Sequence, residues 1–431
     1  MISMNKRFFN IFNLTEEEAI TLLDTPQDQI GEDDSRYIAA SHLVNFSTDS
    51  SINALMRAVQ NTNPSLDNRI VRRKSVETLG RLFATQALSV ICTCLADEDC
   101  YTVENAVWAI GEIGTKNTDI LEEIAQLLEK PGQIYRVILQ TLAKLEYKGA
   151  VERITRFTES EDKPTASAAI TSICRLTGDY AQMDKVVAFL QHPNCNARRA
   201  CIQDLIDACY YPAIPEIARC PVSIAFRLRA IRILADVGVE RGEITFEAIK
   251  PYLEQTLRDH PNDLDLVHEY DQLPTLDFVI RELYQTDFGR CYLGSKTLLD
   301  TYTVQAPIAL LQTYEEEAYT DYGAHYHVIK LLGWLKDAQA YDLLIEALHN
   351  KEPQFQKSRS AAAIALGELG DESAIPDLKK SLKTPIWDLK YAALMSLEKL
   401  GDTSGCEIVA DDSDWLIRAK ANVNSNYICK S

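Results

Sequence analysis

The densest group of side chains able to do chemistry lies at residues 319–327, which read Tyr-Thr-Asp-Tyr-Gly-Ala-His-Tyr-His. If a helix begins near Thr320, Asp321 and His325 are four residues apart and lie on one face. A carboxylate beside an imidazole can hold and move a proton, because each group shifts the pKa of the other. We therefore take Asp321, His325 and the neighbouring Tyr319 as candidate catalytic residues. The structural alternative is that Asp321 only caps the helix and His325 lies at the surface.

Tyrosine is concentrated around this group. Nine of the 19 tyrosines fall between residues 270 and 341. Three of them, Tyr319, Tyr322 and Tyr326, are spaced three and four residues apart and would share one face of a helix that spans them. The excess is local, which indicates that something other than regular helix stacking shapes this stretch.

The elements that must position these side chains belong to a repeat. Its motif helix ends in Leu or Ile, a small residue, one variable residue and Leu or Ile, as in residues 105–114 and 361–371. A second apolar-periodic helix follows each motif helix. The equivalent positions, 29 to 36 residues apart within each of two runs, are Val44, Gly80, Gly111, Ala143, Cys174, Ile206 and Ala235, then Gly333, Gly367 and Glu398. The sequence predicts an all-α fold, a HEAT-like α-solenoid in which stacked helical hairpins form a curved superhelix.

The motif also predicts how the helices pack and how the chain is organised. A small residue at the fixed position would let the next helix approach closely. No low-complexity linker interrupts the sequence, so we expect one elongated domain over residues 1–431. Its predicted parts are an N-terminal helical cap (1–34), regular repeats (35–239), an irregular Tyr-rich segment that is the candidate ligand site (240–324), regular repeats (325–405) and a C-terminal cap (406–431).

Basic side chains open several of the motif helices. They form three groups: Arg69, Arg72, Arg73 and Lys74; Arg198 and Arg199; and Arg227, Arg229 and Arg232. At the same point of successive repeats they would line one edge of the superhelix and could bind carboxylates. Alternatively they pair with acidic neighbours on the helix surface, as the four-residue spacing of Arg73, Glu77 and Arg81 allows. We favour surface pairing for most of them.

Composition excludes several classes of function. The formal net charge of −19 opposes binding to nucleic acid or to anionic lipid. No segment reaches the roughly 18 consecutive apolar residues of a membrane helix, and the start of the chain lacks a signal-peptide core, so we expect a cytoplasmic protein. The common phosphate-loop, dinucleotide and hydrolase motifs are absent. No metal site is expected, because His325 and His327 would point to different faces of a helix.

Two stretches resemble a known family. Residues 67–82, and residues 94–114 with the string Val-Glu-Asn-Ala-Val-Trp-Ala-Ile-Gly, are similar to the phycobilin lyases of the E/F type, which are HEAT-repeat proteins. Within that clan they are most similar to the phycoerythrobilin lyases and lyase-isomerases that act on phycoerythrin α-subunits. The opening residues 5–15 agree, and the resemblance covers nearly the whole chain.

The resemblance implies an enzyme with no permanently bound cofactor. It would bind a linear tetrapyrrole, phycoerythrobilin, as substrate and deliver it to an apo-phycoerythrin α-subunit. There a cysteine of the acceptor would form a thioether with the ring-A ethylidene carbon. A lyase-isomerase would also move a double bond and give phycourobilin. Members of the clan can act as pairs, so a second lyase subunit is a further expected partner.

The same resemblance gives the candidate residues their roles. A bilin needs an aromatic wall, for which we take Tyr322, Tyr326, Tyr292 and Tyr284. It also needs a carboxylate for its pyrrole N–H groups, which Asp321 would supply, and cations for its two propionates, which Arg232 and Arg229 would supply. Isomerisation would use Asp321, His325 and a nearby tyrosine. Cys291 is the thiol of this chain to exclude as a carrier by mutation. The alternative function is a non-catalytic HEAT-repeat scaffold or chaperone that binds a phycobiliprotein or another protein.

Overall fold

The chain is built from helices. The computed structural model describes residues 14–31 and 34–428, and side chains as far as residue 422; across these residues there is no strand, which confirms the all-α solenoid. Residues 1–13 and 32–33 of the predicted N-terminal cap, and 429–431 of the C-terminal cap, lie outside the described part. The chain divides into two compact units, Met1–Met183 and Asp184–Ser431, and the boundary falls within the predicted run of regular repeats. No helix of the described chain is both long enough and apolar enough to cross a membrane.

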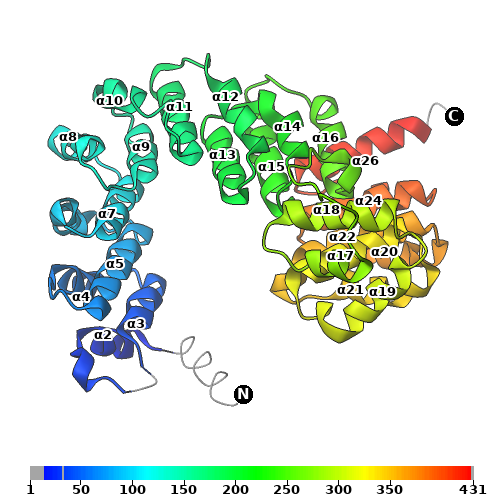
Figure 1. Ribbon diagram of the computed structural model, residues 1–431, viewed down its shortest axis with the longest axis horizontal. Helices are drawn as coiled ribbons and strands as arrows, with labels where there is room; N and C mark the ends of the chain where they lie inside the picture. The colour runs from blue at the N-terminus through cyan, green and yellow to red at the C-terminus, as the bar shows by residue number, and fades with distance from the viewer. Residues whose placement is uncertain (1–13, 32–33, 429–431) are drawn as a thin grey trace. The chain divides into compact units, whose positions relative to one another are not determined.

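The first unit is a stack of helical hairpins (Figure 1). Its longer first helices pack in sequence, α5 on α7, α7 on α9 and α9 on α11. Its helices are α2 (Glu16–Asp24), α3 (Arg36–His42), α4 (Asp49–Gln60), α5 (Leu66–Arg81), α6 (Leu88–Cys92), α7 (Cys100–Ile113), α8 (Thr118–Gln126), α9 (Tyr135–Lys144), α10 (Val151–Thr155) and α11 (Lys163–Thr177). Helix α12 (Met183–Ala188) begins at the boundary between the units.

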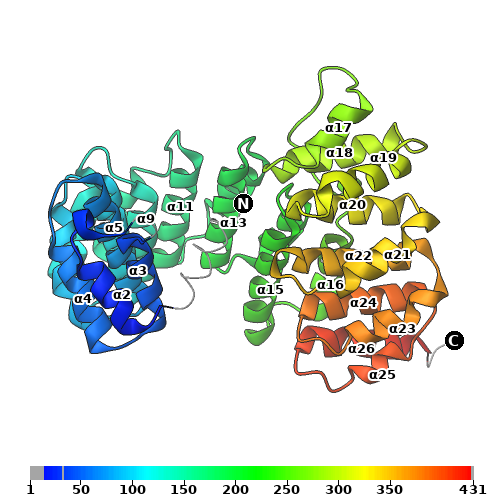
Figure 2. The same cartoon turned by 90° about the horizontal axis from the view of Figure 1, so that it is seen from below.

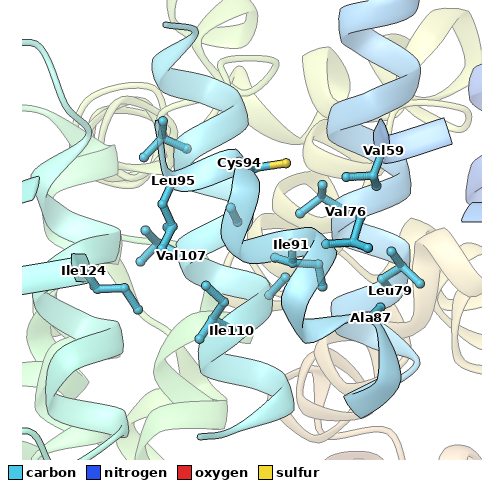
Figure 3. Close-up of a cluster of buried hydrophobic side chains, with 14 of the residues drawn as sticks. Val59, Val76, Leu79, Ala87, Ile91, Cys94, Leu95, Val107, Ile110 and Ile124 are labelled. Atoms are coloured by element: carbon cyan, nitrogen blue, oxygen red, sulfur yellow. The ribbon is translucent and has the colours of Figure 1, made fainter. Parts of the chain in front are cut away.

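The core of the first unit runs along this stack. Val76 and Leu79 of α5 meet Ile91 of α6, and Val107 and Ile110 of α7 continue the cluster (Figure 3). All five side chains are buried. Three-residue spacing puts Val76 and Leu79 on one face of α5, and Val107 and Ile110 on one face of α7, so burying these faces stacks one hairpin on the next.

The small residue of the motif brings neighbouring first helices close together, as the sequence predicts. A β-carbon added to Gly80 would lie 2.9 Å from the Cβ atom of the next first helix. One added to Gly333 would lie 2.4 Å from Cβ of Ala365, and one added to Gly367 would lie 2.6 Å from Oγ of Ser396. Such distances are too short for real contacts. Glycine at these positions therefore sets the spacing between successive repeats.

The second unit continues the pattern (Figure 2). Residues 240–324, where the repeat register is lost, are still mostly helical; α16 is followed by a long connection, residues 259–275, and α19 runs into a π-helical turn, Tyr314–Ala318. The helices are α13 (Cys195–Asp207), α14 (Ile214–Arg219), α15 (Ile224–Glu240), α16 (Phe246–Arg258), α17 (Leu276–Glu282), α18 (Phe288–Asp300), α19 (Ala306–Thr313), α20 (Tyr322–Trp334), α21 (Tyr341–His349), α22 (Gln356–Leu369), α23 (Ile375–Ser381), α24 (Trp387–Lys399), α25 (Gly405–Ile408) and α26 (Trp415–Ile428).

The beginning of the second unit folds back against its end. Helices α20, α22 and α24 stack in order, and α16 packs against α22 and α24 (Figure 2). Arg232 on α15 binds Asp414 just before α26, with its Nη1 2.8 Å from Oδ2. The indole Nε1 of Trp415 donates to Asp236 Oδ1 at 2.7 Å. These contacts enclose the space between α15 and the starts of α20, α22 and α24.

Candidate functional site

A cavity of about 540 Å³ lies in that space. This is within the range of about 300–1,000 Å³ that is usual for small-molecule sites. Its walls are mainly apolar; polar side chains lie near the starts of α20, α22 and α24, and Arg229 and Arg232 lie further along α15. The residues that line it include Ile224, Leu228, Arg229, Arg232 and Ile233 of α15, Tyr322 of α20, Gln356, Lys357 and Ser360 of α22, and Trp387 and Asp388 of α24.

The two arginines of the cavity are already hydrogen-bonded. Arg232 binds the carboxylates of both Asp236 and Asp414, and its guanidinium lies 5.3 Å from the ring centre of Trp387. The Nη1 atom of Arg229 donates to the amide oxygen of Gln203 at 2.8 Å. Both residues line the cavity, where the sequence places its carboxylate-binding cations, but Arg232 has its charge balanced by the protein itself.

A lysine that the sequence analysis did not single out also lines the cavity. The ammonium of Lys357 lies over three aromatic rings, 4.4 Å from the centre of Phe288, 4.8 Å from Tyr322 and 5.0 Å from Tyr326. Burial lowers the pKa of Lys357 to about 8. At neutral pH the group is still mostly a cation, held against ring faces that carry no full charge.

The cavity also holds a buried carboxyl group whose pKa is raised. Asp388, in the first turn of α24, accepts a hydrogen bond from Oγ of Ser360 at 2.9 Å. Burial raises the pKa of Asp388, and that hydrogen bond offsets only part of the shift. A carboxyl group poised in this way can accept hydrogen bonds from ligand N–H groups or hold a proton.

A buried polar network links α15, α18 and α20 to the C-terminal end of α16. Its centre is Asp259, which caps α16 in the left-handed conformation and has no exposed surface. Its carboxylate binds Arg227 and Lys330 and accepts hydrogen bonds from the hydroxyls of Tyr292, at 3.0 Å, and Tyr326, at 2.5 Å. Burial alone would raise the pKa of Asp259, but the charges of Arg227 and Lys330 outweigh it and hold that pKa below its usual value. Two buried cations thus share one carboxylate and two phenols.

Asp321 is the N-cap of α20. Its Oδ1 atom accepts hydrogen bonds from the backbone N–H groups of Gly323, at 2.8 Å, and Ala324, at 2.7 Å. This is the capping alternative raised from the sequence. Tyr319 lies before the helix and is half exposed. Neither residue is among those that line the cavity.

His325, in the first turn of α20, is buried. Its Nδ1 atom lies 2.9 Å from Oγ of Ser358, and its Nε2 atom lies 3.4 Å from the hydroxyl of Tyr314. The ring stacks on Phe355, with centres 4.4 Å apart. Burial lowers the pKa of His325 to about 4, so the imidazole is neutral at pH 7. Since both ring nitrogens have other partners, the Asp321–His325 pair expected from the spacing does not form. The alternative of a surface His325 does not hold either, because the side chain is buried.

The four tyrosines expected to form one aromatic wall fall in three places. Tyr322 is half exposed and lines the cavity. Tyr292 and Tyr326 are fully buried in the Asp259 network, where they donate to its carboxylate. Tyr284 lines a separate, polar cavity of about 350 Å³ beside α17 and α19, and its hydroxyl contacts Oγ1 of Thr313 at 2.7 Å. The expectation of a single wall of tyrosines is therefore corrected. One tyrosine lines the main cavity, and the indole of Trp387 supplies its other aromatic surface.

Most of the basic residues at helix starts have a structural task. The Nε atom of Arg72 donates to the carbonyl of Val59 at 2.7 Å, and Nη1 of Arg227 donates to the carbonyl of Ala218 at 3.0 Å. Arg198 in the same way binds the carbonyls before its helix. These buried guanidinium groups tie each first helix to the hairpin before it. The same scan for basic residues at helix starts, extended to the second run of repeats, would have found Lys357 but not Asp388.

Comparison with known proteins places the chain in a family. The HEAT repeats family matches residues 354–424. Over 97% of its length the chain is 63% identical to the whole of "Uncharacterized phycocyanin operon protein Y" from Pseudanabaena tenuis. Over 90% of its length it is 31% identical to 96% of "Bilin biosynthesis protein CpeY" from a Synechococcus strain. Over 53% of its length it is 29% identical to 88% of "Phycocyanobilin lyase subunit alpha" from Synechococcus elongatus.

The fold and the relatives together define a HEAT-repeat protein of the bilin-handling class. The chain belongs to the E/F-type phycobilin lyases. It is thus a bilin lyase, an enzyme of chromophore attachment to phycobiliproteins.

Proposed function

We propose that this lyase attaches phycoerythrobilin through a thioether to a cysteine of a phycoerythrin α-subunit, and that the cavity between α15, α20, α22 and α24 holds the bilin. The lining of that cavity is the observation that supports this placement of the bilin. It combines apolar side chains and an indole with cations and one carboxyl group whose pKa is raised by burial. A flat tetrapyrrole with pyrrole N–H groups and two propionates needs this combination. The bilin is a substrate here and not a resident cofactor.

The reaction requires little chemistry from the lyase itself. The acceptor thiol adds across the ethylidene double bond of ring A: a sulfur–carbon bond forms, the carbon–carbon π bond breaks, and the proton lost by sulfur is balanced by one gained at the ring carbon. No oxidant or reductant is consumed. The contribution of the lyase is to hold the bilin in one orientation against the acceptor cysteine. Trp387, Leu228 and Tyr322 would contact its conjugated faces, and Asp388 would accept hydrogen bonds from its N–H groups.

The product and the partners are separate parts of the proposal. Phycourobilin would require proton transfer, and the residues expected to perform it, Tyr319, Asp321 and His325, are not among those that line the cavity. We therefore favour unchanged phycoerythrobilin as product and keep phycourobilin as the second outcome. A second lyase subunit is a proposed partner, because one relative is named as a subunit. A phycocyanin subunit is the second candidate acceptor, because another relative is named after the phycocyanin operon.

Co-expression tests the activity. The chain is produced with phycoerythrobilin synthesis and an apo-phycoerythrin α-subunit, or an apo-phycocyanin subunit in a parallel culture. Bilin that stays on the acceptor after denaturation is read by absorbance. A band at the phycoerythrobilin position is expected, and a bluer band would show that the product is phycourobilin. No adduct on either acceptor, with bilin and acceptor both present and a second lyase subunit supplied, would refute the proposal and leave the scaffold or chaperone function.

A matched pair of variants tests the cavity. Trp387→Ala removes the indole from the cavity wall, and we expect at least a tenfold loss of adduct. Phe278→Ala removes a half-exposed ring on α17 that does not line the cavity, and we expect no loss. Equal yields from the two variants would place the bilin elsewhere.

A further inference from the structure

The cations of the main cavity differ in whether the protein balances their charge. Arg232 is paired with two aspartates, and Arg229 is hydrogen-bonded to a glutamine. Lys357 is different: among the described residues its ammonium has neither an ion pair nor a hydrogen bond, only the faces of three rings. The charges of Asp259 and Asp321 act on it without direct contact, and a cation that is partly removed from water and lacks a paired carboxylate is costly. An anion that entered the cavity would remove that cost.

The surroundings of Lys357 limit what that anion can be. The ammonium is confined by Phe288, Tyr322 and Tyr326, so an approaching group reaches it from the cavity side. The rest of the cavity wall is apolar and aromatic, which excludes a small hydrated anion as the best ligand and favours a carboxylate carried on a large conjugated body. The lowered pKa of Lys357 agrees with this geometry, because burial outweighs the charges of Asp259 and Asp321 and no carboxylate is paired directly with the ammonium.

We propose that Lys357 binds a carboxylate of the ligand in this cavity and so fixes how the ligand is oriented there. The inference rests on the proposed function, under which that carboxylate is a propionate of the bilin. It moves the anion-binding role from Arg229 and Arg232, which the sequence favours, to a lysine at the start of α22. Because the carboxylate ends up beside Phe288 and Tyr322, the conjugated part of the ligand then extends along α15 toward Trp387.

A cycle of two proteins and two ligands tests the proposal. Phycoerythrobilin and its dimethyl ester are titrated into the purified full-length chain and into the Lys357→Met variant, and binding is followed by bilin absorbance. The free acid should bind the variant at least tenfold more weakly than it binds the wild type, whereas the ester should bind both proteins equally and weakly. Lys383→Met, at an exposed lysine outside the cavity, is the control and should bind the acid like the wild type.

Each other outcome contradicts a defined part of the reasoning. If Lys357→Met weakens acid and ester alike, or weakens neither, Lys357 does not bind the carboxylate, although the chain still binds the bilin. If the wild type binds neither ligand, the cavity is not a bilin site and the role of Lys357 is refuted with it. Lys357→Gln is measured in parallel, and the unfolding midpoint of each variant shows whether it is folded. A variant that binds the ester like the wild type is folded by that measurement as well.

Discussion

Replacing Asp259 by Asn should destabilise the second unit more than any surface substitution. The change keeps the size of the side chain but removes the one negative charge that Arg227 and Lys330 share. Neither cation can turn toward water, because Arg227 has no exposed surface and Lys330 is 4% exposed. Removing one partner of a buried ion pair typically costs about 3–5 kcal/mol, since the remaining charge stays buried and unpaired. We expect a loss near the middle of that range.

Urea unfolding followed by tryptophan fluorescence measures this loss. Three of the four tryptophans, Trp334, Trp387 and Trp415, lie in the second unit, so Trp108→Phe gives a background in which fluorescence reports that unit alone. If the free energy of unfolding falls by about 3 kcal/mol per molar urea, the midpoint of unfolding should fall by about 1.3 M. The control is Asp300→Asn, which breaks an exposed pair with Lys296 and should cost about 0.5 kcal/mol or less.

A second substitution identifies the cause of the loss. Adding Lys330→Met to Asp259→Asn removes one of the two unpaired cations, so the double variant should be more stable than Asp259→Asn alone. If Asp259→Asn shifts the midpoint no more than the Asp300 control does, or if Lys330→Met lowers stability further in its presence, the Asp259 network is not held by charge pairing and the reasoning is wrong.

Three further results are expected. Burial lowers the pKa of His325 to about 4, so the stabilisation from its neutral form is complete above pH 6.5 and about 3 kcal/mol of it is lost as the pH falls toward 4. His325→Gln should therefore flatten the acid side of the curve of stability against pH by that amount. An unchanged curve would contradict the burial argument. Cys291→Ser should leave adduct formation on the acceptor intact in co-expression, because the thiol is buried and its pKa is raised to about 12; loss of the adduct with a folded variant would restore Cys291 as a carrier. Tyr284→Phe should bind phycoerythrobilin as tightly as the wild type in an absorbance titration, since Tyr284 lines the other cavity; weaker binding would move the bilin there.

The repeat could be predicted from the sequence because it depends on neighbours in the chain. Periodic apolar residues and a fixed small residue suffice to predict stacked hairpins, and the contact of Gly80 with the next first helix follows from them. Arg229, Arg232 and Tyr322 were expected to serve one ligand, and they do line one cavity. The signal for the two arginines was the recurrence of basic groups along the repeat, and the signal for Tyr322 was the local excess of tyrosine.

The buried network could not be predicted in the same way. Asp259 follows a helix and looks like an ordinary cap, while its partner Tyr326 is 67 residues further on and joins it only when α20 packs beside α18 and the end of α16. The Asp321–His325 pair failed for a related reason. Four-residue spacing brings two side chains to one helix face. The carboxylate of Asp321 instead accepts hydrogen bonds from the unpaired backbone N–H groups at the start of α20.

The glycine contacts between first helices have a consequence for how such an enzyme can change its substrate. Gly333 and Gly367 hold α20, α22 and α24 at their separation, and these are the helices whose starts line the main cavity. A methyl group added at Gly333 would push α20 and α22 apart, and one added at Gly367 would push α22 and α24 apart. Either change would widen or tilt the opening of the cavity without changing a residue that lines it. If the bilin binds in this cavity as proposed, chromophore preference can change through these contacts between helices, without any change in the residues that line the cavity.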